Sequence, residues 1–253
     1  MYVYLYDNFL RKGKYEALVK SMENRLTDFG IAGKIIRLQN LTNAQEIVED
    51  EVRKGAETVV IVGDDTTFGH VLSRAASAET VFGFLPVGPD NAIAEILGIP
   101  SGEEACEVLS RRRKIKLDVG WVNNRYFVSR LTVEPAEISV VYDEKFKVFS
   151  EPGKKLELVV CNLMPYVENE KREKIIIHPQ DGKLEAFLRP VARKSLFKTV
   201  YEEASVFPFE EMVVSGNRAF TVEADGKKSK ETKIKIKLAK KKVEMVVGKD
   251  RQF

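Results

Sequence analysis

The run Thr-Val-Val-Ile-Val-Gly-Asp-Asp-Thr-Thr at residues 58–67 constrains the fold more than any other stretch of this chain. Its apolar, β-branched part ends at Gly63, and Asp64, Asp65 and two threonines follow directly. A continuous apolar run of this kind is typical of a buried strand in a parallel sheet, and ligands bind at the carboxyl ends of such strands. A second strand-to-loop corner follows at residues 81–91. The two corners together predict one site, built from neighbouring loops at one edge of a sheet.

Strand and helix patterns alternate along residues 1–113. Two sequence pairs match the capping box that begins a helix, Thr42 with Gln45 and Ser101 with Glu104. The alternation predicts a doubly wound, mostly parallel α/β domain with helices on both faces of its sheet. The expected strands are 3–6, 34–38, 59–62 and 81–85, and the expected helices are 14–29, 42–55, 66–77, 91–97 and 101–113.

From residue 114 onward the pattern changes to short strands. Two pairs, Asn123-Asn124 and Asp225-Gly226, are typical of tight turns because their residues tolerate positive φ. Residues 189–205 have apolar positions at helical spacing and are predicted to form a helix. We therefore expect residues 114–253 to form a mostly antiparallel β-sandwich domain. Its expected strands are 114–117, 119–122, 125–131, 138–148, 156–161, 174–177, 184–188, 219–224 and 232–238.

Composition argues against several classes of protein. The chain has 41 basic and 38 acidic residues, a net charge of +3, which is not the strong basic bias of a nucleic-acid binder. Its two cysteines and two histidines show no zinc-ligand spacing. No basic leader and no apolar run of about 20 residues is present. These observations predict a cytoplasmic protein.

Six short motifs follow one another in a fixed order. They are Asn8 with 12–14 (Lys-Gly-Lys), 63–67 (Gly-Asp-Asp-Thr-Thr), 86–91 (Pro-Val-Gly-Pro-Asp-Asn), 117–120 (Leu-Asp-Val-Gly), 181–184 (Asp-Gly-Lys-Leu) and 225–227 (Asp-Gly-Lys). In this order the chain resembles the diacylglycerol kinase catalytic-domain family, which includes bacterial lipid kinases and sphingosine kinases and is distantly related to NAD kinases. The resemblance implies ATP and Mg²⁺ as cofactors. It also implies that phosphate is transferred to the free hydroxyl of a lipid, which is held in a cleft between two domains. Such a reaction is a step of phospholipid metabolism. Such transfer depends mainly on positioning and charge neutralisation.

The resemblance also implies roles for individual residues. Asp65 is the expected catalytic carboxylate and metal ligand, and Asp225 is a candidate base. The positions expected to contact the nucleotide are Asn8, Gly63, Asp64, Thr66, Thr67, Gly88 and Asn91.

Several motif positions differ from the family pattern. Asp64 and Thr66 stand where the family has glycines that let backbone N–H groups approach phosphate. Pro89 replaces a threonine, which removes a hydroxyl and a backbone donor. Lys227 replaces the carboxylate often taken as the base, and an ammonium group does not accept a proton, although it can contact phosphate. Two hypotheses follow: an ATP-dependent lipid kinase with a remodelled loop, or a pseudokinase that binds nucleotide or lipid without transfer.

Other interpretations of the same residues stay open. Asp64 and Asp65 also suit a polar turn that ends a buried strand, and Asp225 suits a turn tip. NAD kinase activity is the nearest competing chemistry, although the second half of the chain follows the lipid-kinase order. The lysines of residues 233–238 alternate and share one face. That pattern fits a protected edge strand and equally a face on acidic headgroups, which would place the protein peripherally at the inner membrane face.

Overall fold

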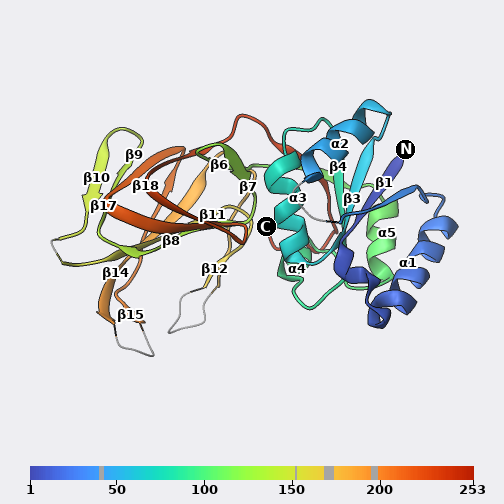
Figure 1. Ribbon diagram of the computed structural model, residues 1–253, viewed down its shortest axis with the longest axis horizontal. Coiled ribbons are helices and arrows are strands. Elements are labelled where there is room, and N and C mark those ends of the chain that lie inside the picture. The colour runs from blue at the N-terminus through green and yellow to red at the C-terminus, as the bar shows by residue number, and fades with distance from the viewer. Residues whose placement is uncertain (40–42, 152, 168–173, 195–198) are drawn as a thin grey trace. The chain divides into compact units, whose positions relative to one another are not determined.

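The computed structural model describes residues 1–39, 43–151, 153–167, 174–194 and 199–253. The chain forms two compact units, Met1–Leu117 with Lys241–Phe253, and Asp118–Lys240 (Figure 1). The sequence-based division after residue 113 assigned the last thirteen residues to the second domain, whereas β19 (Val243–Val246) pairs with strands of the first unit. Thr42 of the first expected capping box lies outside the described residues.

The first unit is built on a six-stranded sheet with the order β2-β1-β3-β4-β19-β5, parallel except for β5. Its strands are β1 (Tyr2–Tyr6), β2 (Lys34–Arg37), β3 (Thr58–Gly63), β4 (Val81–Pro86), β5 (Lys114–Leu117) and β19. Its helices are the short 3₁₀ turns η1 (Asn8–Arg11) and η2 (Gly13–Tyr15), then α1 (Glu16–Asp28), α2 (Ala44–Arg53), α3 (Asp65–Ala75), α4 (Ala92–Ile96) and α5 (Glu104–Ser110).

Helices cover both faces of this sheet, as the alternating pattern predicts. Figure 1 shows α1 and α5 on one side of the strands and α3 on the other. Every residue of β3 is buried, which is the burial that a strand between two helical layers requires. The buried apolar stripe of α1, formed by Val19, Met22 and Leu26, has the i, i+3, i+7 spacing of an amphipathic helix.

The second unit is an antiparallel sheet with the order β15-β14-β11-β8-β17-β18-β6-β7. Strand β16 pairs with β14, and the hairpin of β9 and β10 pairs through β9 with β17. The strands are β6 (Gly120–Val122), β7 (Arg125–Phe127), β8 (Arg130–Ala136), β9 (Ile138–Tyr142), β10 (Phe146–Phe149), β11 (Leu156–Cys161), β12 (Tyr166–Val167), β13 (Lys174–Ile175), β14 (Leu184–Lys194), β15 (Thr199–Tyr201), β16 (Ser205–Phe209), β17 (Glu211–Ala224) and β18 (Lys227–Leu238). One apolar cluster, with members from β8, β11, β14, β17 and β18, forms its core.

Three local predictions are wrong. The described part of residues 189–205 does not form a helix: β14 pairs with β11 as far as Pro190, its remaining residues pair with β15, and β16 pairs back with β14. The strand expected at 138–148 is a hairpin, with Asp143 and Glu144 at positive φ. Ser101 caps no helix, since α5 begins after Glu103 without a side-chain cap.

The expected class of fold is confirmed: a mostly parallel α/β sheet followed by a large antiparallel β-sheet. Both predicted turns form, with Asn123 and Asp225 at φ of 51° and 45°. The alternating lysines of residues 233–238 lie on β18, which pairs with β17 on one side and, at its end, with β6 on the other. Within the described residues, no helix has the length and apolarity that crossing a bilayer requires.

Candidate functional site

The loops after β1, β3 and β4 lie together at the carboxyl edge of the first sheet. Parallel strands bring these ends to the same edge, and backbone hydrogen bonds tie the loops to their neighbours. The N–H of Asp7 donates to Val62 O at 3.0 Å, and the N–H of Val87 donates to Gly63 O at 2.7 Å. The N–H of Asp65 donates to Asp90 O at 2.8 Å. The two corners expected to form one site therefore meet.

Asp64 and Asp7 hold the start of α3. The Asp64 carboxylate caps the helix, since its Oδ1 accepts the N–H of Thr67 at 2.9 Å. The Thr67 hydroxyl lies 2.7 Å from Asp7 Oδ2 and 3.0 Å from Asp64 Oδ1. Thr67 is only 1% exposed. The threonine expected to contact phosphate is thus buried and hydrogen-bonded to carboxylates of the chain itself.

Asp65 joins the β3–α3 loop to the first turn of α4. Its two carboxylate oxygens lie 3.1 and 3.2 Å from the backbone N–H of Ile93, which donates to them. Burial raises the pKa of Asp65 to about 6, and the nearby Asp64 and Asp90 act in the same direction. The backbone N–H groups of Ile93 and Ala92 act against this rise. Asp65 is therefore a partly buried carboxyl that titrates near neutral pH.

The two retained glycines are required by close packing. A Cβ atom on Gly63 would lie 2.6–2.9 Å from the side chain of Thr67. Gly88 has φ of +136°, and a Cβ there would lie 3.0 Å from the Cβ of Asp64 and 3.2 Å from the ring of Phe9. The loop after β4 therefore contacts the Asp64 side chain directly.

Of the other residues predicted to contact the nucleotide, Asn91 is held by a hydrogen bond, whereas Asn8 and Thr66 are exposed. Asn91 Nδ2 donates to Gly88 O at 2.9 Å, and its Oδ1 is buried without a hydrogen-bond partner among the described residues. Asn8 begins η1 and Thr66 lies in the first turn of α3, and both are exposed. The sequence predictions did not include Asp7 in the site, although a carboxylate directly after the first strand was a visible signal.

Asp225 lies in the second unit, at the turn between β17 and β18, and is 9% exposed. Its carboxylate accepts the backbone N–H groups of Val128, Ser129 and Arg130 at 2.7, 3.0 and 3.1 Å. The hydroxyl of Ser129 also donates to it. Burial raises the pKa of Asp225, and these donors oppose the rise. Lys227, two residues on, is exposed.

The role of Asp65 as a metal ligand stays a prediction. In the part of the chain that the structure describes, no group of three or more His, Cys, Asp or Glu side chains is arranged to hold a metal ion. The carboxylates of Asp7, Asp64 and Asp65 are instead hydrogen-bonded to backbone N–H groups and to Thr67.

Comparison with known proteins supports the resemblance found in the sequence. Residues 3–122 match the family model described as the diacylglycerol kinase catalytic domain. No curated protein matches the chain. A solved diacylglycerol kinase from Bacillus anthracis str. Sterne is 14% identical, with 99% of this chain and 97% of that chain covered and a TM-score of 0.78. Another solved chain from the same organism is 15% identical, with 98% of each chain covered and a TM-score of 0.78. At these identities the solved structures establish a shared fold.

Proposed function

We propose that the chain, whose residues 3–122 match the diacylglycerol kinase catalytic-domain model, is a pseudokinase of that family, a member that transfers no phosphate. One observation carries the proposal. Two of the N–H groups at the start of α3, which would face a bound phosphate, are already bonded within the chain. Asp64 Oδ1 accepts the N–H of Thr67 at 2.9 Å, and Asp90 O accepts that of Asp65 at 2.8 Å.

The charge of these loops supports the same conclusion. Asp7, Asp64, Asp65 and Asp90 all lie in the loops at the carboxyl edge. Two like charges about 4 Å apart repel by roughly 4 kcal/mol at an effective dielectric near 20. A triphosphate would therefore meet the Asp64 carboxylate where the family offers a glycine N–H group, with three more carboxylates in the same loops, and the loops in this arrangement do not fit ATP in that manner.

The candidate base is equally poor at accepting a proton. Both oxygens of Asp225 already accept hydrogen bonds, from three backbone N–H groups and one hydroxyl. A general base needs an oxygen that can reach the substrate proton. Lys227 carries an ammonium group at the position of the family carboxylate. Asp225 thus serves the structure of the turn, and the second unit offers no replacement base at these two positions.

An ATP- and Mg²⁺-dependent lipid kinase is the second candidate, and one observation favours it. Asp65 keeps the carboxylate of the family motif, and its pKa of about 6 leaves it mostly ionised at neutral pH. An ionised carboxylate is a good ligand for Mg²⁺, and a bound Mg²⁺ would neutralise charge between the loops and a nucleotide. In that case a lipid with a free hydroxyl would be the acceptor.

Nucleotide binding and transfer distinguish the two candidates. ATP binding is measured with and without Mg²⁺, and transfer of radiolabelled phosphate is measured to mixed diacylglycerols in detergent micelles. The pseudokinase predicts no transfer. It also predicts that Asp64→Gly with Thr66→Gly strengthens ATP binding by about tenfold, because the N–H of Thr67 is released and one negative charge is removed.

The control is Asp28→Ala, which removes an exposed carboxylate at the end of α1 and should leave ATP binding unchanged. Mg²⁺-dependent transfer that is lost in Asp65→Ala and kept in the control would establish the kinase and refute the pseudokinase. Unchanged ATP affinity in the double glycine variant would show that the α3 N-terminus does not face phosphate.

A further inference from the structure

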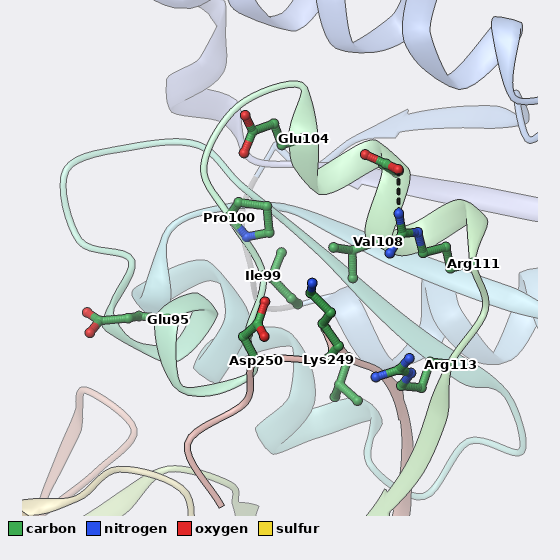
Figure 2. A pocket seen from close by; sticks show the side chains of 13 residues that line it. Glu95, Ile99, Pro100, Glu104, Val108, Arg111, Arg113, Lys249 and Asp250 are labelled. Atoms are coloured by element: carbon green, nitrogen blue, oxygen red, sulfur yellow. Dashed lines mark hydrogen bonds and ion pairs between the residues drawn. The ribbon is translucent and has the colours of Figure 1, made fainter.

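A cavity lies within the first unit, and no residue of the loops after β1 and β3 lines it. Its volume is about 530 Å³, within the range of roughly 300–1,000 Å³ that small-molecule sites occupy. It is formed by the end of α4, by α5 and by the segment that follows β19 (Figure 2). Neither the motifs nor the proposed function above uses it.

The backbone holds the segment after β19 firmly in place. The N–H of Val247 donates to Arg113 O at 2.9 Å, and the N–H of Gly248 donates to Leu97 O at 2.9 Å. A Cβ atom on Gly248 would lie 1.7 Å from Gly98 O, so only glycine permits this approach. These contacts bring Lys249 to the cavity wall beside α5.

The labelled charges at the two edges of the cavity differ in sign, while Lys249 and Asp250 lie next to each other near the middle of the view (Figure 2) and Glu107 pairs with Arg111. Figure 2 shows Arg111 and Arg113 on one side of the view and Glu95 and Glu104 on the other, with apolar side chains between them. The apolar residues in that middle region are Ile99, Pro100 and Val108. A molecule that spans the cavity would therefore meet positive charge, then apolar surface, then negative charge.

Some of these charges are already paired and some are not. Arg111 pairs with Glu107 at 2.6 Å, and Glu95 accepts a hydrogen bond from Gln252 at 3.1 Å. The other four charged residues of the lining make no ion pair with any described residue: Arg113, Lys249, Glu104 and Asp250. Two unpaired charges of each sign are thus left in one cavity. A purely anionic or purely cationic ligand would compensate one pair and lie near the other pair with like charge.

We propose that this cavity binds a small zwitterion with an aliphatic body. Its carboxylate or phosphate group meets Arg113 and Lys249, its ammonium group meets Glu104, and its body covers Ile99. Charge-assisted contacts at both ends fix the orientation of such a ligand, and the apolar middle selects for a carbon chain. The inference stands on this cavity alone and does not depend on whether the protein transfers phosphate.

Three probes with the same aliphatic chain length test the proposal: ε-aminocaproate, caproate and hexylamine. NMR titration of the full chain at low ionic strength compares their affinities. The zwitterion should bind about fivefold more tightly than either singly charged probe, the upper end for partly exposed ion pairs. Equal binding of caproate and ε-aminocaproate, or no binding of the zwitterion, would overturn the proposal.

Single substitutions of exposed residues assign the two ends. Lys249→Gln should weaken binding of ε-aminocaproate and caproate and leave hexylamine unchanged. Glu104→Gln should weaken ε-aminocaproate and hexylamine and leave caproate unchanged. The control Lys20→Gln removes an exposed charge on α1 and should change none of the three affinities. Equal effects of Lys249→Gln and Glu104→Gln on all three probes would contradict the assignment of separate charged ends.

Discussion

Replacement of Asp225 by alanine should destabilise the second unit severely, although the residue lies at a turn. Its carboxylate is the acceptor for three backbone N–H groups and the Ser129 hydroxyl, and it is 9% exposed. Each buried donor left without a partner costs about 1–3 kcal/mol. Because water can reach part of the opened turn and such losses are not additive, we expect a loss of about 3–5 kcal/mol in the free energy of unfolding.

Urea denaturation followed by tryptophan fluorescence measures this loss in the correct unit. The single tryptophan, Trp121, lies on β6 of the second unit and packs edge-on against Tyr126 at a centroid distance of 4.7 Å. Its signal therefore reports the second unit, and unfolding of the first unit does not need to coincide with it. The midpoint and the slope of the transition together give the free energy of unfolding.

Two further variants make the result specific. Asp225→Asn keeps one acceptor oxygen and the tolerance for positive φ, so about half of the loss should remain. Asp181→Ala is the matched control, since Asp181 also precedes a glycine but is exposed and accepts one hydrogen bond, from Lys183 N at 3.0 Å. It should cost less than about 1 kcal/mol. A loss below about 1 kcal/mol in Asp225→Ala would refute the structural role and leave Asp225 available as a base.

Three other substitutions test the site in the first unit. Gly63→Ala should cost about 1–3 kcal/mol of unfolding free energy, because the new methyl group would clash with Thr67. Gly13→Ala is the control and should cost little, because no atom lies within 4 Å of the added methyl group. Equal melting temperatures of the two variants in calorimetry would contradict this packing. Asp65→Asn should flatten the stability profile between about pH 4 and 6. Because the folded-state pKa is about 6 against 3.8, the stability that this carboxyl contributes is complete below about pH 4 and is lost as pH rises through 6, and solvent screening of this partly exposed group keeps the loss to about 1 kcal/mol. Parallel profiles of variant and wild type in urea titrations would refute that shift. Thr67→Val should lower the melting temperature by an amount equivalent to about 1–2 kcal/mol, since the single hydroxyl proton that lies between Asp7 and Asp64 is lost, and no change would show that this hydroxyl bond is weak.

The sequence predicts the parts of the fold that depend on local pattern. The continuous apolar run of β3 and the helical period of α1 are local signals, and both elements form where expected. The return of β19 to the first sheet is a long-range pairing with β4 and β5 that no local pattern contains. Residues 189–205 were mistaken for a helix because Val191, Val200 and Tyr201 fit helical spacing, although such residue types favour strands, and in the structure they pair in the β14–β15 hairpin.

In the candidate site, too, the sequence predicts which loops meet but not which side chains bond to each other. Sequence order brings the loops after β3 and β4 to one edge, and the bond between Asp65 and Ile93 N confirms that these loops meet. The engagement of Thr67 by Asp7 was not predictable, because a hydrogen bond between positions sixty residues apart depends on how β1 and β3 align. Sequence comparison gives the position of a side chain in a motif, whereas the partner of that side chain is a property of the folded loops.

The substitutions at the start of α3 are best understood as one coupled change. A glycine in place of Asp64 would leave the N–H of Thr67 without its present acceptor, and a phosphate is one group that satisfies such a donor. With Asp64 present, the helix is capped and the Thr67 hydroxyl gains a second carboxylate beside Asp7. The loop is thereby capped without a ligand, and in the proposed pseudokinase this cap takes the place of a nucleotide phosphate. A chain that evolved toward ATP binding from this state would have to lose the cap, at a cost of about 1 kcal/mol, before the N–H groups became available again.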